Sequence, residues 1–270
     1  MKLPSIISSL NNKQIKNLTL LQKKAKARKE QGLFVVEGIK MFDEARSARL
    51  LIKTYMSESF YQDKINERDF LMGLDYEILT DDLLRRISDT ITPQGIMGIV
   101  RKPEYTLDEM LKHKDAFLLL LEDIRDPGNL GTIIRTAEGA GVTGIILNKT
   151  CADILQPKVV RATMGSIYRV PYYEAEDFTS LIAMLKTKDF KIFAAHLSGD
   201  SYDKEGGFLG NCGLLIGNEA NGLSDEASKA ADNLIRIPME GKVESLNAAV
   251  AAAIIMYEAA RQRRLNNDKK

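Results

Sequence analysis

Residues 237–253 read IPMEGKVESLNAAVAAA, and the fold of the second half of the chain depends on this stretch. Strand-like residues 237–239 lead through a glycine-containing loop into a long helix, which begins at Ser245-Leu246-Asn247 and is lined with alanines. An alanine-lined helix packs very close to its neighbours, and the backbone N–H groups of its first turn are free to meet a ligand. Such a helix is equally typical of a buried element without a ligand, so this stretch alone leaves both interpretations open.

Short, continuously apolar runs adjoin this stretch and alternate with helical patterns. The runs cover residues 117–121, 144–147, 192–195, 213–217 and 234–237. The helical patterns cover residues 129–139, 158–165 and 178–187. Short apolar strands separated by helices are typical of a parallel sheet that is covered on both faces. The sequence therefore predicts a parallel α/β domain over residues 116–270.

Residues 1–102 show a similar alternation on a smaller scale. Strand patterns occupy residues 33–36, 50–56, 76–79 and 96–100. Helical patterns occupy residues 14–30, 39–48, 58–74 and 81–87. This alternation predicts a separate, small α/β domain. Residues 103–115 are largely polar and begin with Pro103, which predicts a linker between the two domains.

The composition is that of an ordinary globular protein. Hydrophobic residues make up 44% of the chain and charged residues 28%, which is enough apolar material for a core. No apolar run approaches the roughly 18 residues of a membrane helix, and the first residues lack the apolar segment of a secretory signal. The few cysteines and histidines have neither disulfide nor metal-ligand spacing, so we expect a reduced, cytoplasmic protein without a metal.

Basic residues are unevenly distributed, although the net charge is only +1. Residues 13–29 contain no acid and carry Lys13, Lys16, Lys23, Lys24, Lys26, Arg28 and Lys29. A basic stripe on a nearly neutral protein is typical of a nucleic-acid-binding surface. A solvated helix face has the same composition, so charge alone does not distinguish the two.

The segment DIRDPGNLGTIIR, residues 123–135, follows an apolar run and enters a helix. Ligands of open parallel sheets usually bind where such strands end. Asn129 is a residue type that caps helices well. Arg135 lies beside apolar residues on the same helix, where its charge needs a partner or solvent. A structural cap and an intramolecular salt bridge explain these two residues as well as a catalytic role does.

The segment LLIGNEANGLS, residues 214–224, ends an apolar strand with Gly217 and continues to Glu219. Gly217 allows another segment or a flat ligand to approach the backbone closely. Glu219 lies just beyond the strand end, where we expect it to orient Arg135. A plain surface turn over residues 218–222 is the alternative.

Other functional classes lack their motifs in this chain. Gly128, Gly131 and Gly139 do not form G-x-G-x-x-G, and no acid closes a second strand to bind a ribose, which argues against a nucleotide-binding oxidoreductase. The phosphate loop G-x-x-x-x-G-K-[ST] and the nucleophile elbow G-x-S-x-G are also missing from the sequence.

Taken together and in order, these segments resemble the signature motifs of the SpoU (TrmH-like) family of RNA ribose 2′-O-methyltransferases. The matching motif positions are Asn129 and Arg135, then Gly217 and Glu219, then Ile237, Pro238, Met239, Ser245, Leu246 and Asn247. The resemblance extends over residues 116–262 and includes residues 194–198 and Gly165-Ser166 before Pro171. Ala195 stands where some members carry Thr, which puts one side-chain contact in doubt. Residues 34–38, FVVEG, resemble the family's substrate-binding domain.

The resemblance implies a methyl transfer from S-adenosylmethionine to a ribose 2′-hydroxyl, in a domain with a deep trefoil knot. It implies that the cofactor is held chiefly by backbone groups of Ala195, Gly217, Ile237, Met239 and Leu246. It implies that Arg135 is the central catalytic residue, with Asn129, Glu219, Ser245 and Asn247 around it. Because a guanidinium keeps its proton, we expect Arg135 to position the RNA and stabilise the developing oxyanion.

The resemblance also implies structured RNA as the partner, either ribosomal or transfer RNA with ribosomal RNA favoured. It implies a homodimer through the C-terminal helix, which carries Ala251, Ala252, Ile255 and Ala259 for close packing. A non-catalytic RNA-binding protein that kept the fold is the alternative, and the presence of all the motif residues argues against it. The particular RNA and nucleotide are not encoded in motifs of this kind, because RNA specificity lies in shape and loop contacts.

Overall fold

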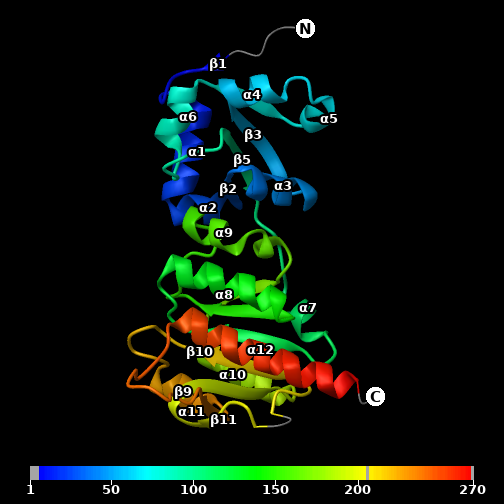
Figure 1. Cartoon of the computed structure of the whole chain (residues 1–270), viewed down its shortest axis with the longest axis vertical. Helices are drawn as coiled ribbons and strands as arrows, with labels where there is room; N and C mark the ends of the chain where they lie inside the picture. Colours follow the sequence, from blue (N-terminus) through cyan, green and yellow to red (C-terminus); the bar gives the residue numbers. More distant parts are fainter. Residues whose placement is uncertain (1–5, 205–206, 269–270) are drawn as a thin grey trace. The chain divides into compact units, whose positions relative to one another are not determined.

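The computed structural model describes residues 6–204 and 207–268 and divides into two compact units (Figure 1). Unit 1 contains the described residues up to Pro103 together with Asp153–Tyr168. Unit 2 contains Glu104–Ala152 and the described residues from Arg169 onward. The boundary between residues 103 and 104 falls in the region predicted as a linker. Asp153–Tyr168, in contrast, belongs to unit 1 although its position in the sequence placed it in the second domain.

Unit 1 is built on a five-stranded mixed sheet with the strand order β1-β4-β3-β5-β2. The strands are β1 (Ile6–Ile7), β2 (Leu33–Glu37), β3 (Leu51–Ser57), β4 (Tyr76–Leu79) and β5 (Ile96–Arg101). Strand β3 pairs parallel with β4 and antiparallel with β5. The predicted strands of this domain are confirmed to within one residue at each end. Strand β1 is too short to produce an apolar pattern, so the sequence did not predict it.

The helices of unit 1 are more broken than their patterns predict. They are α1 (Lys13–Lys23), α2 (Ala25–Gln31), α3 (Ile39–Ser47), α4 (Glu58–Lys64), α5 (Arg68–Leu71) and α6 (Asp81–Ile87). The single helix predicted over residues 14–30 is wrong, because Lys24 adopts an extended conformation between α1 and α2. The Arg28 guanidinium donates hydrogen bonds to the carbonyls of Leu21 (2.6 Å) and Gln22 (2.9 Å) in the last turn of α1. Those carbonyls would be needed if the helix continued.

Arg28 is a structural residue of unit 1. Its side chain is only 5% exposed and forms an ion pair of 2.6 Å with Asp153. Asp153 precedes α9 (Pro157–Thr163) and the 3₁₀ turn η1 (Ser166–Tyr168), and α9 packs on β2. A buried charge is tolerated when it is paired and hydrogen-bonded in this way. The predicted basic stripe therefore loses Arg28, whereas its lysines are exposed.

Unit 2 is built on a six-stranded sheet with the order β11-β9-β10-β6-β7-β8, in which all neighbouring strands pair parallel. The strands are β6 (Phe117–Leu121), β7 (Gly144–Asn148), β8 (Tyr172–Ala175), β9 (Lys191–Ser201), β10 (Cys212–Ile216) and β11 (Asn233–Arg236). This arrangement confirms the predicted parallel α/β fold. Strand β8 was not predicted, because its sequence YYEA is not a continuous apolar run.

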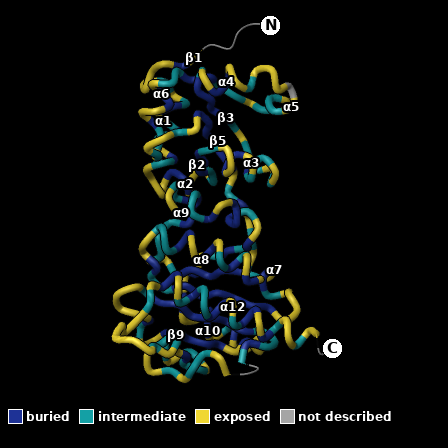
Figure 2. Tube along the Cα trace, viewed as in Figure 1, coloured by how far each residue is buried: buried dark blue, intermediate teal, exposed yellow. Residues whose placement is uncertain are grey.

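Helices cover both faces of this sheet. They are α7 (Leu107–Leu111), α8 (Pro127–Gly139), α10 (Phe178–Thr187), α11 (Asp225–Ala230) and α12 (Ala248–Asn267). Leu118 and Leu120 of β6 pack with residues of α7, α10 and α11 in one core cluster. Leu119 and Leu121 point to the opposite face and are just as fully buried. Helices α8 and α12 pack against each other (Figure 1), and the buried strands stand out in Figure 2.

The strand order decides where a site can form. Strands β11, β9, β10 and β6 are consecutive neighbours in the parallel sheet, so their carboxyl ends lie along the same edge. The loops that follow these strands carry the motif segments identified in the sequence. Of the helices within residues 6–204 and 207–268, none has the length and apolar character of a membrane span.

Candidate active site

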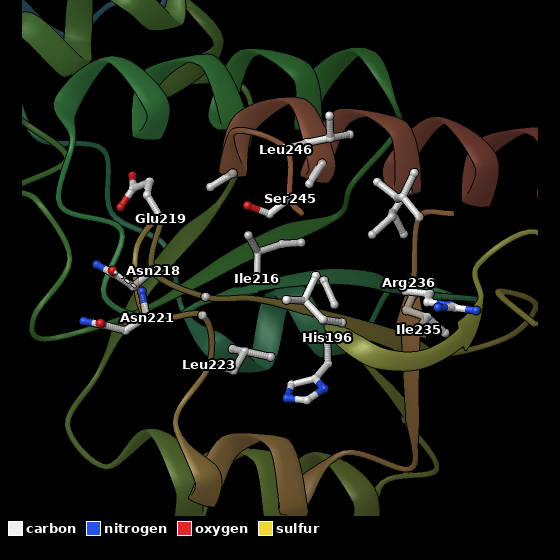
Figure 3. Close-up of a pocket in the computed structure, with 18 of the residues that line it drawn as sticks. His196, Ile216, Asn218, Glu219, Asn221, Leu223, Ile235, Arg236, Ser245 and Leu246 are labelled. Atoms are coloured by element: carbon white, nitrogen blue, oxygen red, sulfur yellow. Dashed lines mark hydrogen bonds between the residues drawn. The ribbon is translucent and has the colours of Figure 1, made fainter. Parts of the chain in front are cut away.

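A pocket of about 320 Å³ lies at the carboxyl ends of β10 and β11, beside the middle of β9, and reaches the first turns of α12 (Figure 3). Residues 195–197 of β9, the loops that follow β10 and β11, and the start of α12 form its walls. The lining includes every residue predicted to bind the cofactor, namely Ala195, Gly217, Ile237, Met239 and Leu246. Apolar side chains of Leu197, Ile216, Leu223, Ile235 and Ile255 complete much of the wall.

The second motif folds into a tight turn that forms one wall. The backbones of Asn218 and Gly222 bond to each other in both directions, at 2.9 and 3.0 Å. A Cβ placed on Gly217 would lie 2.4 Å from backbone atoms of Gly222 and Leu223. Glycine at position 217 therefore allows the turn to fold back on the strand end, which is the close approach that the sequence predicted.

Asn218 fixes the conformation of this turn, a role that the sequence did not reveal. Its side-chain oxygen accepts hydrogen bonds from the N–H groups of Ala220 (2.9 Å) and Asn221 (3.0 Å). Its amide nitrogen donates to the carbonyl of Asp123 at 2.9 Å. Glu122 accepts both the N–H (2.8 Å) and the hydroxyl (2.7 Å) of Ser224 at the far end of the turn. The first motif therefore anchors the second.

Glu219, Asn129 and Asn247 form a hydrogen-bonded chain that joins all three motifs. Asn129 donates to the Glu219 carboxylate at 2.8 Å, and Asn247 donates to the Asn129 side-chain oxygen at 3.0 Å. Glu219 and Ser245 line the pocket itself. The structure thus brings Asn129, Glu219 and Asn247 together beside the pocket, and Ser245 lies in the pocket wall.

The start of α12 differs from the prediction by a few residues. Asn247 is the N-cap, because its side-chain oxygen accepts hydrogen bonds from Ala249 (2.9 Å) and Val250 (3.3 Å). Ser245 and Leu246 therefore lie in the loop before the helix. Strand β11 ends at Arg236, so residues 237–239 also belong to this loop rather than to a strand. In a loop, the backbone groups of these residues can face the pocket. In a regular strand, the same groups would form hydrogen bonds with a neighbouring strand.

Asp126, not Asn129, caps α8. The Asp126 side chain accepts a hydrogen bond of 2.7 Å from the backbone N–H of Asn129. Aspartate and asparagine both cap helices well, so the sequence alone did not decide between them. Because Asp126 takes this role, the Asn129 amide is free to join Glu219 and Asn247.

Arg135 stands apart from the chain of polar residues. It follows Asn129 by six positions, which turns it by roughly 240° around the helix axis. Its side chain is exposed and makes no hydrogen bond or ion pair with any residue that the structure describes. Glu219 bonds to Asn129, and the predicted pairing of Glu219 with Arg135 is not found within the described residues. The intramolecular salt bridge considered for Arg135 is not found within the described residues either.

Further polar residues that were not predicted as site residues also line the pocket, among them His196, Asn221 and Arg236. The His196 Nδ1 atom lies 2.8 Å from the Ser198 hydroxyl and 3.2 Å from the Ser198 backbone nitrogen. Arg236 is exposed, and in the view of Figure 3 it lies on the opposite side of the pocket from Glu219. His196 lies in residues 194–198, which the family resemblance covers, whereas only the position beside the pocket identifies Arg236.

The site has no features of thiol or metal chemistry among the described residues. Burial raises the pKa of the Cys151 thiol to about 11, so it stays protonated at neutral pH. No group of three or more His, Cys, Asp or Glu side chains could hold a metal ion within residues 6–204 and 207–268. The polar chain and the pocket are the groups available for chemistry.

Comparison with known proteins assigns both parts of the chain. Residues 116–257 match the model of the SpoU rRNA Methylase family, and residues 12–98 match the MRM3-like substrate binding domain. The chain is 31% identical over 252 residues to the 23S rRNA (guanosine(2553)-2′-O)-methyltransferase RlmP of Bacillus subtilis, covering 93% of this chain and 97% of that protein.

Solved structures agree with this assignment. The AdoMet-bound rRNA methyltransferase from Sinorhizobium meliloti superposes with a TM-score of 0.83 at 30% identity, covering 95% of this chain and 97% of that one. The SpoU methyltransferase AviRb from Streptomyces viridochromogenes, in complex with AdoMet, superposes with a TM-score of 0.81 at 26% identity, covering 94% and 100%. The chain belongs to the SpoU family and is an S-adenosylmethionine-dependent RNA 2′-O-methyltransferase.

Proposed function

We propose that this enzyme methylates a ribose 2′-hydroxyl of ribosomal RNA and that the pocket described above is its active site. The observation that carries the proposal is the hydrogen-bonded chain of Glu219, Asn129 and Asn247 beside a largely apolar pocket. The name of the Bacillus subtilis relative, which specifies 23S rRNA, supports ribosomal RNA as the substrate.

The pocket fits S-adenosylmethionine in size and in chemistry. Its volume of about 320 Å³ lies within the roughly 300–1,000 Å³ of small-molecule sites. The apolar wall suits the adenine ring, and the Glu219 carboxylate suits a positively charged sulfonium. Ala195, Gly217, Ile237, Met239 and Leu246 would hold the cofactor, chiefly through their backbone groups.

The chain's own residues then position the acceptor. S-adenosylmethionine supplies a methyl group that is already activated, so the protein aligns the attacking oxygen and assists the loss of its proton. Glu219, Asn129 and Asn247 form a fixed set of hydrogen-bonding groups for the ribose, and Ser245 adds a hydroxyl from the pocket wall. Arg135 is free to hold an RNA phosphate and to stabilise the oxyanion.

The deep trefoil knot remains part of this proposal. Residues 195–197, 216–223 and 235–246 all contribute to one pocket. We infer that the segment after β11 passes through a loop of the preceding chain, as the family resemblance implies. Such threading would hold these three segments in contact without a disulfide, and both cysteines are free. Free, buried or half-buried thiols also support a cytoplasmic location.

Unit 1 supplies the electrostatic attraction for RNA in this proposal. Helices α1 and α2 expose a row of lysines, of which only Lys26 has an ion pair among the described residues, a 3.8 Å contact with Glu30. The row consists of Lys13, Lys16, Lys23, Lys24, Lys26 and Lys29. Phosphates neutralised by such lysines release counterions, which makes the affinity strong and dependent on salt.

We infer a homodimer, but through other residues than the sequence indicated. Ala252, Ile255 and Ala259 are buried within the chain itself, and Ala251 lines the pocket. Val250 and Tyr257 on α12 are about half exposed, and the Tyr257 hydroxyl lies beside Gly139 of α8, one helical turn beyond Arg135. Packing of this face on a second copy would bury these apolar side chains. Sedimentation equilibrium should therefore give twice the mass of one chain, and a mass of one chain would contradict the inference.

Mapping of 2′-O-methyl groups tests the proposed substrate. We expect that ribosomal RNA from cells without the gene lacks one ribose methylation that is present in the parent, and that the purified enzyme restores it in vitro. If the missing methyl group is found only in transfer RNA, transfer RNA would take the place of ribosomal RNA as the proposed substrate. If no ribose methylation changes and the enzyme restores none, the non-catalytic alternative, an RNA-binding protein with this fold, would be favoured.

A further inference from the structure

The loop between α6 and β5 presents an unusual apolar residue. Ile91 is 100% exposed, whereas Ile87 and Ile96 at the two ends of the loop are buried. Single exposed apolar residues are common on protein surfaces, so the exposure of Ile91 alone indicates no function. Its significance depends on the structure of the loop that carries it.

The loop is held rigidly from beneath. The Glu37 carboxylate is 7% exposed and accepts hydrogen bonds from the Ser88 and Thr90 hydroxyls and from the N–H of Asp89. Asp89 also forms an ion pair of 2.7 Å with Arg161. At the other end, the Gln94 side chain accepts a hydrogen bond of 2.8 Å from the N–H of Ile39. The loop is therefore ordered before any partner binds, which lowers the entropic cost of binding.

A second pocket of the protein lies in unit 1 and opens beside Ile91. We call it the loop hollow. It has a volume of about 590 Å³ and is lined by Ser57, Ser59, Phe60, Asp63, Asp81, Leu84, Arg85, Ile91, Thr92, Pro93, Gln94 and Gly95. Asp81 is engaged by the Ser59 hydroxyl at 2.6 Å. Arg85 and Asp63 are exposed and make no hydrogen bond or ion pair within the described residues. The hollow therefore offers both hydrogen-bond donors and acceptors next to an apolar side chain.

The surroundings of the loop hollow favour RNA as the occupant. Gln22 of α1 donates a hydrogen bond of 2.9 Å to the carbonyl of Ile87, so the end of α1 adjoins the base of the loop. The next residues, Lys23 and Lys24, are exposed. Asp82 and Asp89 are already paired with arginines. Unpaired positive charge thus lies along α1, where phosphates would bind, and mixed polar groups lie in the hollow, where a base edge would bind.

We propose that an unpaired nucleotide of the RNA substrate docks in the loop hollow, with its base packed against Ile91 and its flanking phosphates on the lysines of α1. The proposal rests on the proposed function and specifies where unit 1 contacts the RNA. Unpaired bases of structured RNA are recognised by contact with a side-chain face and by hydrogen bonds to their edges. Apolar side chains such as isoleucine also serve as wedges against nucleic-acid bases.

The full-length variant Ile91→Ala tests this contact, with large-subunit ribosomal RNA transcribed in vitro as the probe. We expect RNA affinity to fall about tenfold at every salt concentration, with an unchanged slope of log affinity against log salt, because an apolar contact releases no counterions. Lys23→Gln/Lys24→Gln should instead flatten the slope, by roughly 0.7 to 0.9 for each phosphate that is no longer neutralised. The affinity for S-adenosylmethionine and the melting temperature should stay as in the wild type.

Met72→Ala is the matched control, because Met72 is a 72% exposed apolar residue of unit 1 that does not line the hollow. It should bind RNA as the wild type does. Wild-type RNA affinity in Ile91→Ala would overturn the proposal. A protein partner would then be the alternative occupant of the loop hollow. An equal loss in Met72→Ala, or a lowered melting temperature in Ile91→Ala, would also overturn it. If the wild type binds cofactor but neither binds nor methylates ribosomal RNA, the proposed substrate fails instead.

Discussion

Arg135→Ala should lower kcat/KM for methyl transfer by about 100-fold, or about 2.7 kcal/mol of barrier, and leave the Kd for S-adenosylmethionine nearly unchanged. The reason is the position of Arg135, which is exposed on α8 and does not line the cofactor pocket. The fold should tolerate the change, because alanine favours helix more than arginine does and the arginine side chain bonds to none of the described residues. Single-turnover kinetics and calorimetric titration with the cofactor measure the two effects separately.

Lys229→Ala is a suitable control, because Lys229 is another exposed basic residue of unit 2 and lies in the last turn of α11, not on the α12 face inferred for the dimer. It should retain wild-type activity. Arg135→Lys keeps the charge but loses the planar guanidinium, and we expect it to recover part of the activity. Retention of activity within about tenfold in Arg135→Ala, roughly 1.4 kcal/mol, would remove Arg135 from the reacting centre.

Gly217→Ala should weaken binding of S-adenosylmethionine by about 100-fold, or about 2.7 kcal/mol. The added Cβ would lie 2.4 Å from backbone atoms of Gly222 and Leu223, which cannot move as a flexible side-chain end can. The turn would have to shift, and this turn carries Glu219 and forms one wall of the pocket. Calorimetric titration measures the loss, and circular dichroism checks that unit 2 remains folded.

Gly241→Ala is the matched glycine control in the same region. A Cβ at Gly241 meets no described atom within 4 Å, and its backbone does not have a positive φ. We expect cofactor affinity to stay within about twofold, a change of roughly 0.4 kcal/mol. Wild-type affinity in Gly217→Ala would mean that the turn is mobile enough to absorb the methyl group. The pocket wall would then not depend on this close approach.

Much of the fold could be predicted, because it depends on local patterns. The limits of β4, β6, α6 and α10 agree with the predicted residues, since each has a strong apolar period and a clear boundary. The helix predicted over residues 58–74 is broken into α4 and α5, as the one over 14–30 is broken into α1 and α2. Long-range contacts such as that of Arg28 with Asp153 leave no periodic pattern in the sequence.

The candidate site was only partly predictable. The motif segments follow strands that are neighbours in the sheet, so their meeting at one edge could be expected once a parallel sheet was predicted. The individual hydrogen bonds between side chains of the site could not be predicted. The bond between Asn129 and Glu219 joins side chains 90 residues apart in the sequence. The cap of α8 is local, but Asp126 and Asn129 are both good capping residues, so the sequence did not decide between them.

The sequence by itself determined the parallel α/β class, the family resemblance and the five predicted cofactor-binding residues, all of which line the pocket. Apolar periodicity and motif order are properties of the linear sequence, so they can be recognised without a structure. Only the tertiary structure decided that Glu219 joins Asn129 rather than Arg135, and that Asp153–Tyr168 belongs to unit 1. Each of these results depends on the helix rotation and strand order that bring distant residues within hydrogen-bonding or packing distance, and no local pattern encodes such distances.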